Sequence, residues 1–264
     1  MEHIQLKNGT RTAYKTAGNG PETLLFLHGF CGSSAYWDKL APLLPQFRLI
    51  LPDLRGHGGS TGKEEPHTME MFAEDLALFA EALELPPFHL FGHSLGGYVT
   101  LAFAEKYPGK LASFGLIHST PFPDDEAARA NRDKSAESIR QNGMEPFIRG
   151  LVPRLFAPGS LSARQDDAEL AKKIGLATDP KAAILTLKGM RDRSNRLHVL
   201  EESKVPVLLV AGDADQIVPA SKTFAADGPH VQQVLLEGVG HMGMLEAPEK
   251  MAEAIARFVR KEFS

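Results

Sequence analysis

The chain contains one cysteine and no large excess of charge of either sign, and each of these facts excludes a class of protein. A single cysteine, Cys31, cannot form an intramolecular disulfide or a cysteine-built metal site, and it fits a reducing compartment. The net charge of −4 offers no basic surface to nucleic acid or to an anionic membrane. No apolar run approaches the roughly 20 residues of a membrane span, and the amino-terminal stretch lacks a signal-peptide pattern. We therefore expect a cytoplasmic protein without nucleic-acid or membrane partners, either a monomer or a dimer.

Hydrophobic residues make up 43% of the 264 residues, which is enough to build one large core. Short apolar runs that end in turn residues alternate with stretches of helical periodicity, and this alternation predicts a mostly parallel sheet covered on both faces. A hairpin is predicted around Asn8-Gly9. Buried strands are predicted at 23–29, 47–53, 87–92, 111–120, 205–212 and 231–238, and helices at 33–44, 68–85 (with Thr68 as N-cap), 97–108 and 247–263.

The stretch from 121 to 203 breaks this alternation. It contains no convincing strand and several helical patterns, at 124–141, 145–156, 166–177 and 179–193. Structureless connections of this length are uncommon in compact domains. The sequence therefore predicts a core formed by 1–120 and 204–264, with a helical cap inserted between two of its strands.

One motif carries the chemistry. Gly92-x-Ser94-x-Gly96 follows an apolar run and precedes a helical pattern, as expected for a sharp strand-to-helix turn that exposes a nucleophilic serine. Small residues on either side let the backbone turn tightly. The alternative is a glycine-rich loop with an incidental serine, so the rest of the chain must supply the partners.

A nucleophilic serine needs a base, and the base needs an acid to orient it. Asp213 and Asp215 follow one predicted strand and His241 follows the next, at the edge of the sheet where ligand sites form. Two backbone donors for an oxyanion are expected in addition. The candidates are the N–H groups of Leu95, directly after the serine, and Phe30, in the loop after an earlier strand.

Together these motifs resemble those of the α/β-hydrolase-fold serine hydrolases, specifically the small capped carboxylesterase-like group. The motifs are LHGF, LPDLRGHGGS, GHSLGG, AGDADQIVP and GVGHMGMLEAP, and they leave only 121–203 without a match. In the family pattern the acid lies three positions after the glycine that ends the strand, which implies Asp215 as the acid and Asp213 as a turn residue or helix cap. The resemblance also implies that His57 is a structural turn histidine and that His93 packs under the serine turn, where it could tune the site.

Four further residues are candidates for contact with substrate: His28, Cys31, Trp37 and His118. His28 is also expected to shape the oxyanion loop, and Cys31 and Trp37 could equally be core residues. His118 ends a predicted strand, where it could face the pocket or pack against its neighbours.

Departures from the family's subgroups narrow the expected reaction. Serine at position 94 argues against the relatives that use aspartate there for epoxides or carbon–halogen bonds. Phe30-Cys31-Gly32 lacks the glycine-proline-glycine loop of carbon–carbon bond hydrolases, and Tyr98 replaces the arginine of menaquinone-pathway synthases. The resemblance therefore implies a hydrolase of small, partly apolar esters or thioesters that needs no cofactor and no metal.

Other functions of a protein with this fold stay open at this point. An intact set of catalytic residues also occurs in relatives that act as small-molecule receptors with very slow turnover. A lyase, a perhydrolase or a transferase of acyl groups to alcohols would use the same site.

Overall fold

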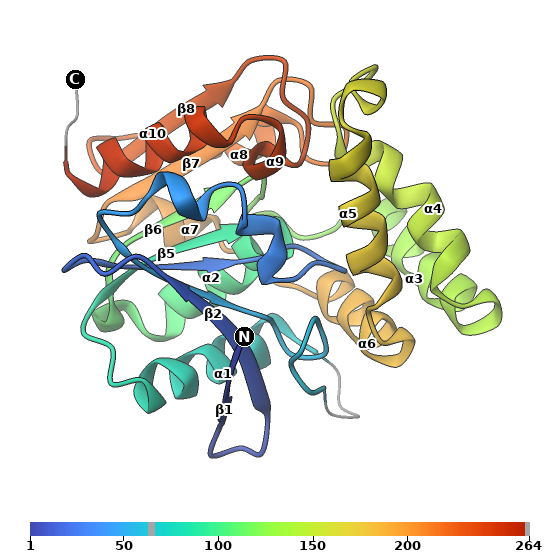
Figure 1. Cartoon of the computed structure of the whole chain (residues 1–264), viewed down its shortest axis with the longest axis horizontal. Helices are drawn as coiled ribbons and strands as arrows, with labels where there is room; N and C mark the ends of the chain where they lie inside the picture. Colours follow the sequence, from blue (N-terminus) through green and yellow to red (C-terminus); the bar gives the residue numbers. More distant parts are fainter. Residues whose placement is uncertain (63–66, 262–264) are drawn as a thin grey trace.

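The computed structural model describes residues 1–62 and 67–261. Within them, the centre of the molecule is an eight-stranded sheet with the order β1-β2-β4-β3-β5-β6-β7-β8 (Figure 1). The strands are β1 (Glu2–Gln5), β2 (Arg11–Ala17), β3 (Thr23–Leu27), β4 (Arg48–Pro52), β5 (Phe88–His93), β6 (Leu111–Ile117), β7 (Val207–Gly212) and β8 (Val231–Leu236).

Strands β3 to β8 run parallel, whereas the β1–β2 hairpin joins β4 in antiparallel pairing. In the register at the centre, Leu25 of β3 lies opposite Ile50 of β4 and Leu90 of β5. Every residue of β3 and β7 is buried, as the continuous apolar runs predict for strands covered on both faces. The predicted mostly parallel α/β sheet is confirmed.

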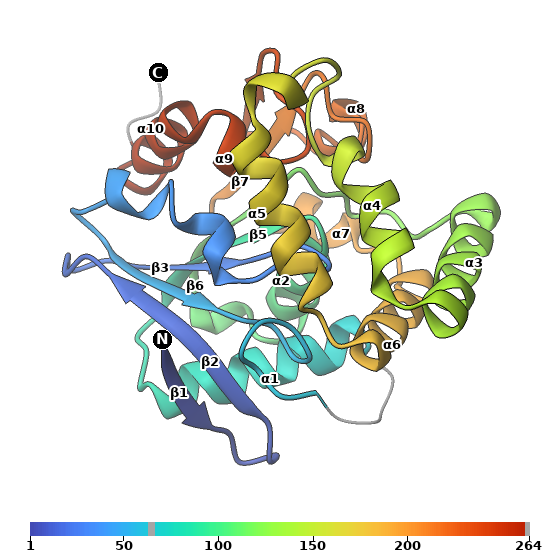
Figure 2. The ribbon, with the colours of Figure 1, turned by 45° about the vertical axis from the view of Figure 1, so that its right-hand side comes forward.

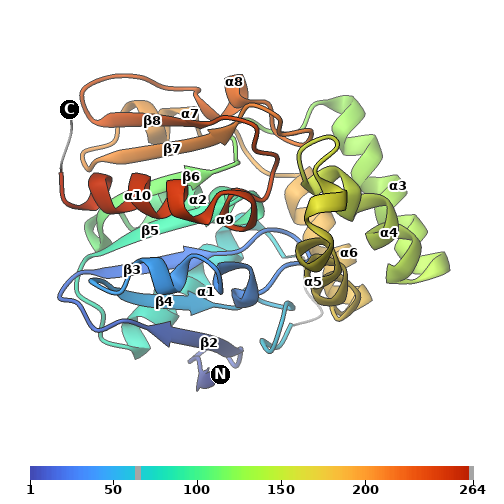
Figure 3. The same ribbon diagram turned by 45° about the horizontal axis from the view of Figure 1, so that its top comes forward.

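Helices cover both faces of this sheet. The core helices are α1 (Met69–Ala82), α2 (Leu95–Lys106), α7 (Leu197–Glu201), α8 (Ala220–Thr223), α9 (Gly243–Glu246) and α10 (Pro248–Val259). Helices α1, α2 and α7 pack together on one face, and α9 and α10 lie on the other with the 3₁₀ turns that follow β3 (Figure 3). No helix in the described part of the chain is long and apolar enough to cross a membrane.

Most local predictions hold, with one clear difference. Thr68 caps α1 as predicted, because its side chain accepts a hydrogen bond from the Met71 N–H. The predicted helix at 33–44 is instead two 3₁₀ turns, Ser34–Trp37 and Ala41–Leu43. Proline at position 42 has no N–H and cannot extend a helical ladder, so the segment breaks into two pieces. The predicted end of the last helix beyond Lys261 lies outside the described residues.

The segment between β6 and β7 is helical. It contains α3 (Glu126–Asn142), α4 (Met144–Leu155), α5 (Gln165–Leu176) and α6 (Pro180–Arg191), close to the four predicted helical patterns. These helices gather at the end of the sheet where the chain leaves β6 (Figures 1 and 2). Helix α7 follows them but lies against α2, where His198 hydrogen-bonds Glu105.

Candidate active site

Ser94 lies between β5 and α2 in a left-handed conformation, with φ 52° and ψ −113°. The flanking glycines are required by close packing. A Cβ at Gly92 would lie 2.1 Å from the Gly96 carbonyl oxygen, and a Cβ at Gly96 would lie 2.5 Å from that of Leu27. The turn therefore has the tight geometry that the Gly-x-Ser-x-Gly spacing predicts, and it leaves the Ser94 side chain half-buried at the edge of the sheet.

Hydrogen bonds hold this strained turn in place. The Ser94 N–H donates to the Ile117 carbonyl at 3.0 Å, and the Ser94 carbonyl accepts from the Ser119 hydroxyl at 2.8 Å. Cys31 and His118 also have positive φ values, of 54° and 48°. Non-glycine residues in this region cost about 1–3 kcal/mol each and concentrate at functional sites.

The loops after β7 and β8 bring an acid and a base together. Asp215 Oδ2 accepts a hydrogen bond from His241 Nδ1 at 2.8 Å, and both side chains are buried. Burial by itself raises the pKa of Asp215, but the neighbouring His241 and His118 lower it further than burial raises it, so the carboxyl stays ionised. Asp213, the alternative acid, is exposed and instead accepts from the Gly238 N–H at 2.7 Å.

His93 ties the serine turn to the loop that carries the base. Its Nε2–H donates to the His241 carbonyl at 2.8 Å, and the two rings lie 4.8 Å apart. A Cβ at Gly29 would lie 2.7 Å from His93 Nδ1 and 3.3 Å from Ser94 Cβ, so the loop after β3 lies directly over both residues. Burial lowers the pKa of His93 well below its ordinary value, which keeps the ring neutral.

The two expected oxyanion donors lie beside Ser94 in the chain and in the loop after β3. Neither the Phe30 N–H nor the Leu95 N–H donates to another backbone group among the described residues. Leu95 is the first residue of α2, where a helix leaves its N–H groups without an internal partner. His28 fixes the Phe30 loop, because its Nδ1–H donates to the Gly29 carbonyl and its Nε2 accepts from the Leu54 N–H.

The remaining sequence candidates are all buried. Trp37 is fully buried and packs against Phe26, with ring centroids 5.0 Å apart, which are the contacts of a core anchor. The Cys31 thiol hydrogen-bonds Thr178, and burial raises its pKa, so it has no thiolate character. His118 hydrogen-bonds the Asp215 carboxylate through Nδ1 at 3.2 Å.

Two of these contacts were not predicted from the sequence: the His118 bond to Asp215 and the His93 bond to the His241 carbonyl. His93 ends β5 and His118 directly follows β6, and these positions were the only signal available. Its partner lies about a hundred residues or more away in the chain, at separations of 97 and 148.

The helical segment touches the loop that carries the base. The His241 N–H donates to the Leu155 carbonyl at the end of α4, at 2.8 Å. Close by, the Ala157 N–H donates to Glu246 Oε2 at 2.9 Å. The end of α4 and the residues just after it are therefore fixed to His241 and to α9.

The same segment also touches the loop that carries Phe30. The rings of Phe30 and Phe147 meet edge to face at 5.9 Å, and Thr178 contacts Cys31 as described. The segment thus contacts the site through α4, at Phe147 and Leu155, and through Thr178 after α5.

One cluster among the described residues could hold a metal ion: His118, Asp215 and His241 lie with one candidate ligand atom each within 4.8 Å of one another. The two hydrogen bonds to Asp215 Oδ2 already account for this proximity, since both histidines point Nδ1 at the same oxygen.

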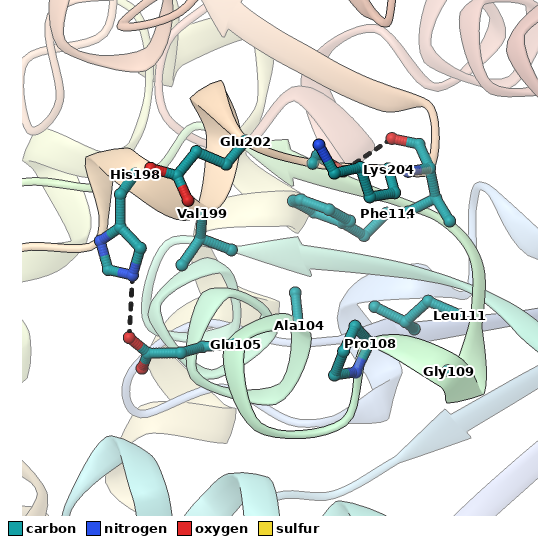
Figure 4. Close-up of a pocket in the computed structure, with 12 residues that line it drawn as sticks. Ala104, Glu105, Pro108, Gly109, Leu111, Phe114, His198, Val199, Glu202 and Lys204 are labelled. Atoms are coloured by element: carbon teal, nitrogen blue, oxygen red, sulfur yellow. Dashed lines mark hydrogen bonds and ion pairs between the residues drawn. The ribbon is translucent and has the colours of Figure 1, made fainter.

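A groove of about 540 Å³ lies at the opposite edge of the sheet (Figure 4). It is lined by Leu111, which begins β6, by Val205 just before β7, and by the ends of α2 and α7. Its serine, Ser203, donates its hydroxyl hydrogen to the Val205 carbonyl at 2.7 Å. The groove is therefore separate from Ser94 and His241, which lie at the carboxyl ends of the strands.

Comparisons with known proteins agree with this fold. A family model described as alpha/beta hydrolase fold matches residues 22–248. The chain is 31% identical, over 90% of its length, to the dihydrolipoyllysine-residue acetyltransferase component of the acetoin cleaving system of Cupriavidus necator, and spans 64% of that relative. It is 30% identical to a putative 2-succinyl-6-hydroxy-2,4-cyclohexadiene-1-carboxylate synthase of Bacillus subtilis over 97% of both chains. A thermophilic esterase from Thermogutta terrifontis superposes with a TM-score of 0.92 at 30% identity over 100% of both chains.

Proposed function

Because the chain belongs to the alpha/beta hydrolase fold family, we propose that it is a serine hydrolase of small, partly apolar carboxylic esters or thioesters. Ser94 is the nucleophile, His241 the general base and Asp215 the acid that orients it. The observation that carries the proposal is the 2.8 Å hydrogen bond from His241 Nδ1 to the buried Asp215 carboxylate, on loops beside the strained Ser94 turn.

The first half of the reaction forms an acyl-enzyme. Ser94 Oγ attacks the ester carbonyl carbon while His241 Nε2 takes the hydroxyl proton. The Phe30 and Leu95 N–H groups donate to the resulting oxyanion, and Asp215 stabilises the imidazolium. The intermediate collapses, the bond to the leaving oxygen or sulfur breaks, and His241 returns its proton to the leaving group.

Water completes the cycle. His241 removes a proton from a water molecule that attacks the acyl carbon, the same donors hold the second oxyanion, and Ser94 leaves with the proton from His241. The products are the carboxylic acid and the free serine. The reaction consumes only ester and water.

Helices α3–α6 act as the cap of this site in our proposal. Their contacts with the Phe30 loop and with the His241 backbone support that role. A closed site excludes water and strengthens the electrostatic interactions on which the oxyanion depends. The apolar ring of Phe147 beside Phe30 favours a partly apolar acyl group.

Tyr98 favours hydrolysis over the synthase reaction of the Bacillus subtilis relative. The resemblance drawn from the sequence implies an arginine at this position in such synthases. Here the Arg193 guanidinium lies over the Tyr98 ring at 4.2 Å and pairs with Asp124 at 2.6 Å. Arg193 is therefore already paired with a carboxylate of the protein.

The test is turnover of a chain-length series of nitrophenyl esters by the wild type and by Ser94→Ala. We expect the variant to lose at least about a thousandfold in kcat, because the nucleophile cannot be replaced by the remaining site. Ser203→Ala, in the groove at the far edge of the sheet, is the matched control and should keep wild-type kcat.

Two outcomes would contradict the proposal. If Ser94→Ala keeps most of the activity, another group is the nucleophile. A burst of about one product per chain followed by no turnover would instead indicate a ligand receptor.

A further inference from the structure

Both oxygens of the Asp215 carboxylate accept hydrogen bonds. Oδ1 accepts from the backbone N–H groups of Ile217 and Val218, at 2.7 and 2.9 Å. Oδ2 accepts from two histidines, His241 at 2.8 Å and His118 at 3.2 Å. The side chain is fully buried, so these donors replace all of the water that would otherwise solvate the charge.

His118 is locked in the orientation that makes this bond. Its backbone N–H donates to the Val210 carbonyl at 2.8 Å, which fixes the residue to the neighbouring strand β7. On the other side of the ring, a Cβ at Gly243 would lie 2.4 Å from His118 Nε2, so only glycine leaves room for the ring there. Burial lowers the pKa of His118, so the ring is neutral and carries its proton on Nδ1, toward the carboxylate.

A second donor on Oδ2 has a chemical consequence for His241. A carboxylate oxygen shared between two N–H donors is a weaker acceptor for each than an oxygen bonded by one alone. Asp215 therefore stabilises the protonated form of His241 less than it would without His118. The second hydrogen bond to Oδ2 also restrains the orientation of the carboxylate.

We propose that His118 is a positioning residue of the active site, which tunes the basicity of His241 and fixes the Asp215 carboxylate through a second hydrogen bond to Oδ2. The inference rests on the proposed hydrolase function for its catalytic meaning. The bond itself and its effect on His241 do not depend on the substrate.

The test compares three variants at position 118. His118→Asn can still donate an amide hydrogen to Oδ2 and tolerates the positive φ. His118→Phe keeps an aromatic ring but cannot donate. His118→Gly also lacks the donor and adopts a φ of 48° without strain, so it serves if the phenylalanine variant fails to fold.

The main readout is the titration of the His241 ring followed by NMR, together with the pH profile of kcat/KM. Loss of the donor concentrates the carboxylate charge on His241, so its protonated form persists to higher pH. In His118→Phe and His118→Gly we expect the ring titration and the acid limb of the profile to move up by about half a pH unit or more. We expect kcat to fall about tenfold or more with KM nearly unchanged, and His118→Asn to stay close to the wild type.

The surrounding groups are the same in all variants, so they cannot produce the shift. The titratable side chains packed around His241 are His93 from β5, His118 directly after β6, Asp215 from the loop after β7 and Glu246 from α9. Only position 118 changes.

The inference is overturned if the non-donating variants titrate at the wild-type pH, or if His118→Asn shifts as much as His118→Phe. The second result would mean that a retained hydrogen-bond donor does not preserve the titration, so the bond to Oδ2 is not its cause. If the wild type shows no Ser94-dependent turnover, the hydrolase proposal fails, while the NMR titration still decides the role of His118.

Discussion

At the scale of single residues, the site depends on which of two neighbouring aspartates faces His241. The two lie two positions apart after the same strand, and sequence spacing alone leaves both available. The fold separates them completely: Asp215 is buried against two histidines, whereas Asp213 is exposed and accepts from the Gly238 N–H. Asp215 is therefore placed to orient a base, whereas Asp213 stabilises a turn.

This difference gives a paired prediction. Asp215→Asn should lower kcat by about a thousandfold to ten-thousandfold, because an amide does not hold His241 in the required tautomer. Asp213→Asn should stay within about twofold of the wild type. Steady-state kinetics on one nitrophenyl ester checks both, and equal losses in the two variants would contradict the assignment of the acid.

At the scale of elements, the serine turn works because β5 and α2 approach each other more closely than side chains allow. Gly96 lies against the Leu27 carbonyl and Gly92 against Gly96 itself. The same closeness places the first N–H of α2 beside the nucleophile, where a helix amino terminus favours negative charge. The stability of the fold and the geometry of the site thus both require glycine at positions 92 and 96.

Substitution of Gly96 by alanine tests this requirement. The added Cβ would meet backbone at 2.5 Å, so we expect a loss of about 3 kcal/mol or more in the free energy of unfolding, with loss of activity. Gly150→Ala in α4 is the control, since nothing lies within 4 Å of a Cβ there. It should be neutral or stabilise by about 0.5–1 kcal/mol. Urea denaturation measures both, and equal effects would contradict the packing argument.

At the scale of the whole molecule, several histidines are buried in the core or partly buried. Burial is the largest cause that lowers the pKa values of five of them: His28, His57, His89, His93 and His118. The pKa of His57 falls to about 3 and that of His89 to about 4. The rings of His93 and His118 lie beside His241, so protonation of these rings at low pH would disturb both the fold and the site.

The direction of the pH effect on stability follows from these depressed values. Below about pH 6.5 the unfolded chain binds protons that the folded chain cannot, so the free energy of unfolding falls as the pH drops. Each histidine contributes up to about 1.4 kcal/mol per pH unit until its own folded pKa is reached, about 3 for His57.

We therefore expect urea midpoints to fall steeply between pH 6.5 and 4, a window taken from these shifts. His57→Gln should reduce the slope by about 1.4 kcal/mol per pH unit, because it removes one such group without touching Ser94 or His241. A midpoint that stays constant between pH 7 and 5 would contradict the prediction.

Local sequence determined the strands, the helices and the kind of turn that holds Ser94. Apolar runs, helical periodicity, the Thr68 cap and the glycines around Ser94 act over a few residues, so they can be interpreted without knowing what they touch. Parallel strands also end at one edge of a sheet, which is why the positions of Ser94, His241 and the two aspartates after their strands were enough to propose one site. The family resemblance, and not the spacing, implied Asp215 as the acid. The division at 121–203 is a prediction from a change of periodicity. The structure has α3–α6 in this stretch, whereas α7 near its end lies against α2 of the core.

Only the tertiary structure decided which groups contact one another across long stretches of chain. It placed His118 on the Asp215 carboxylate and His93 on the His241 carbonyl, and it fixed the end of α4 against the same loop. These features depend on hydrogen bonds and packing between residues far apart in sequence, for which a local pattern of polarity carries no signal.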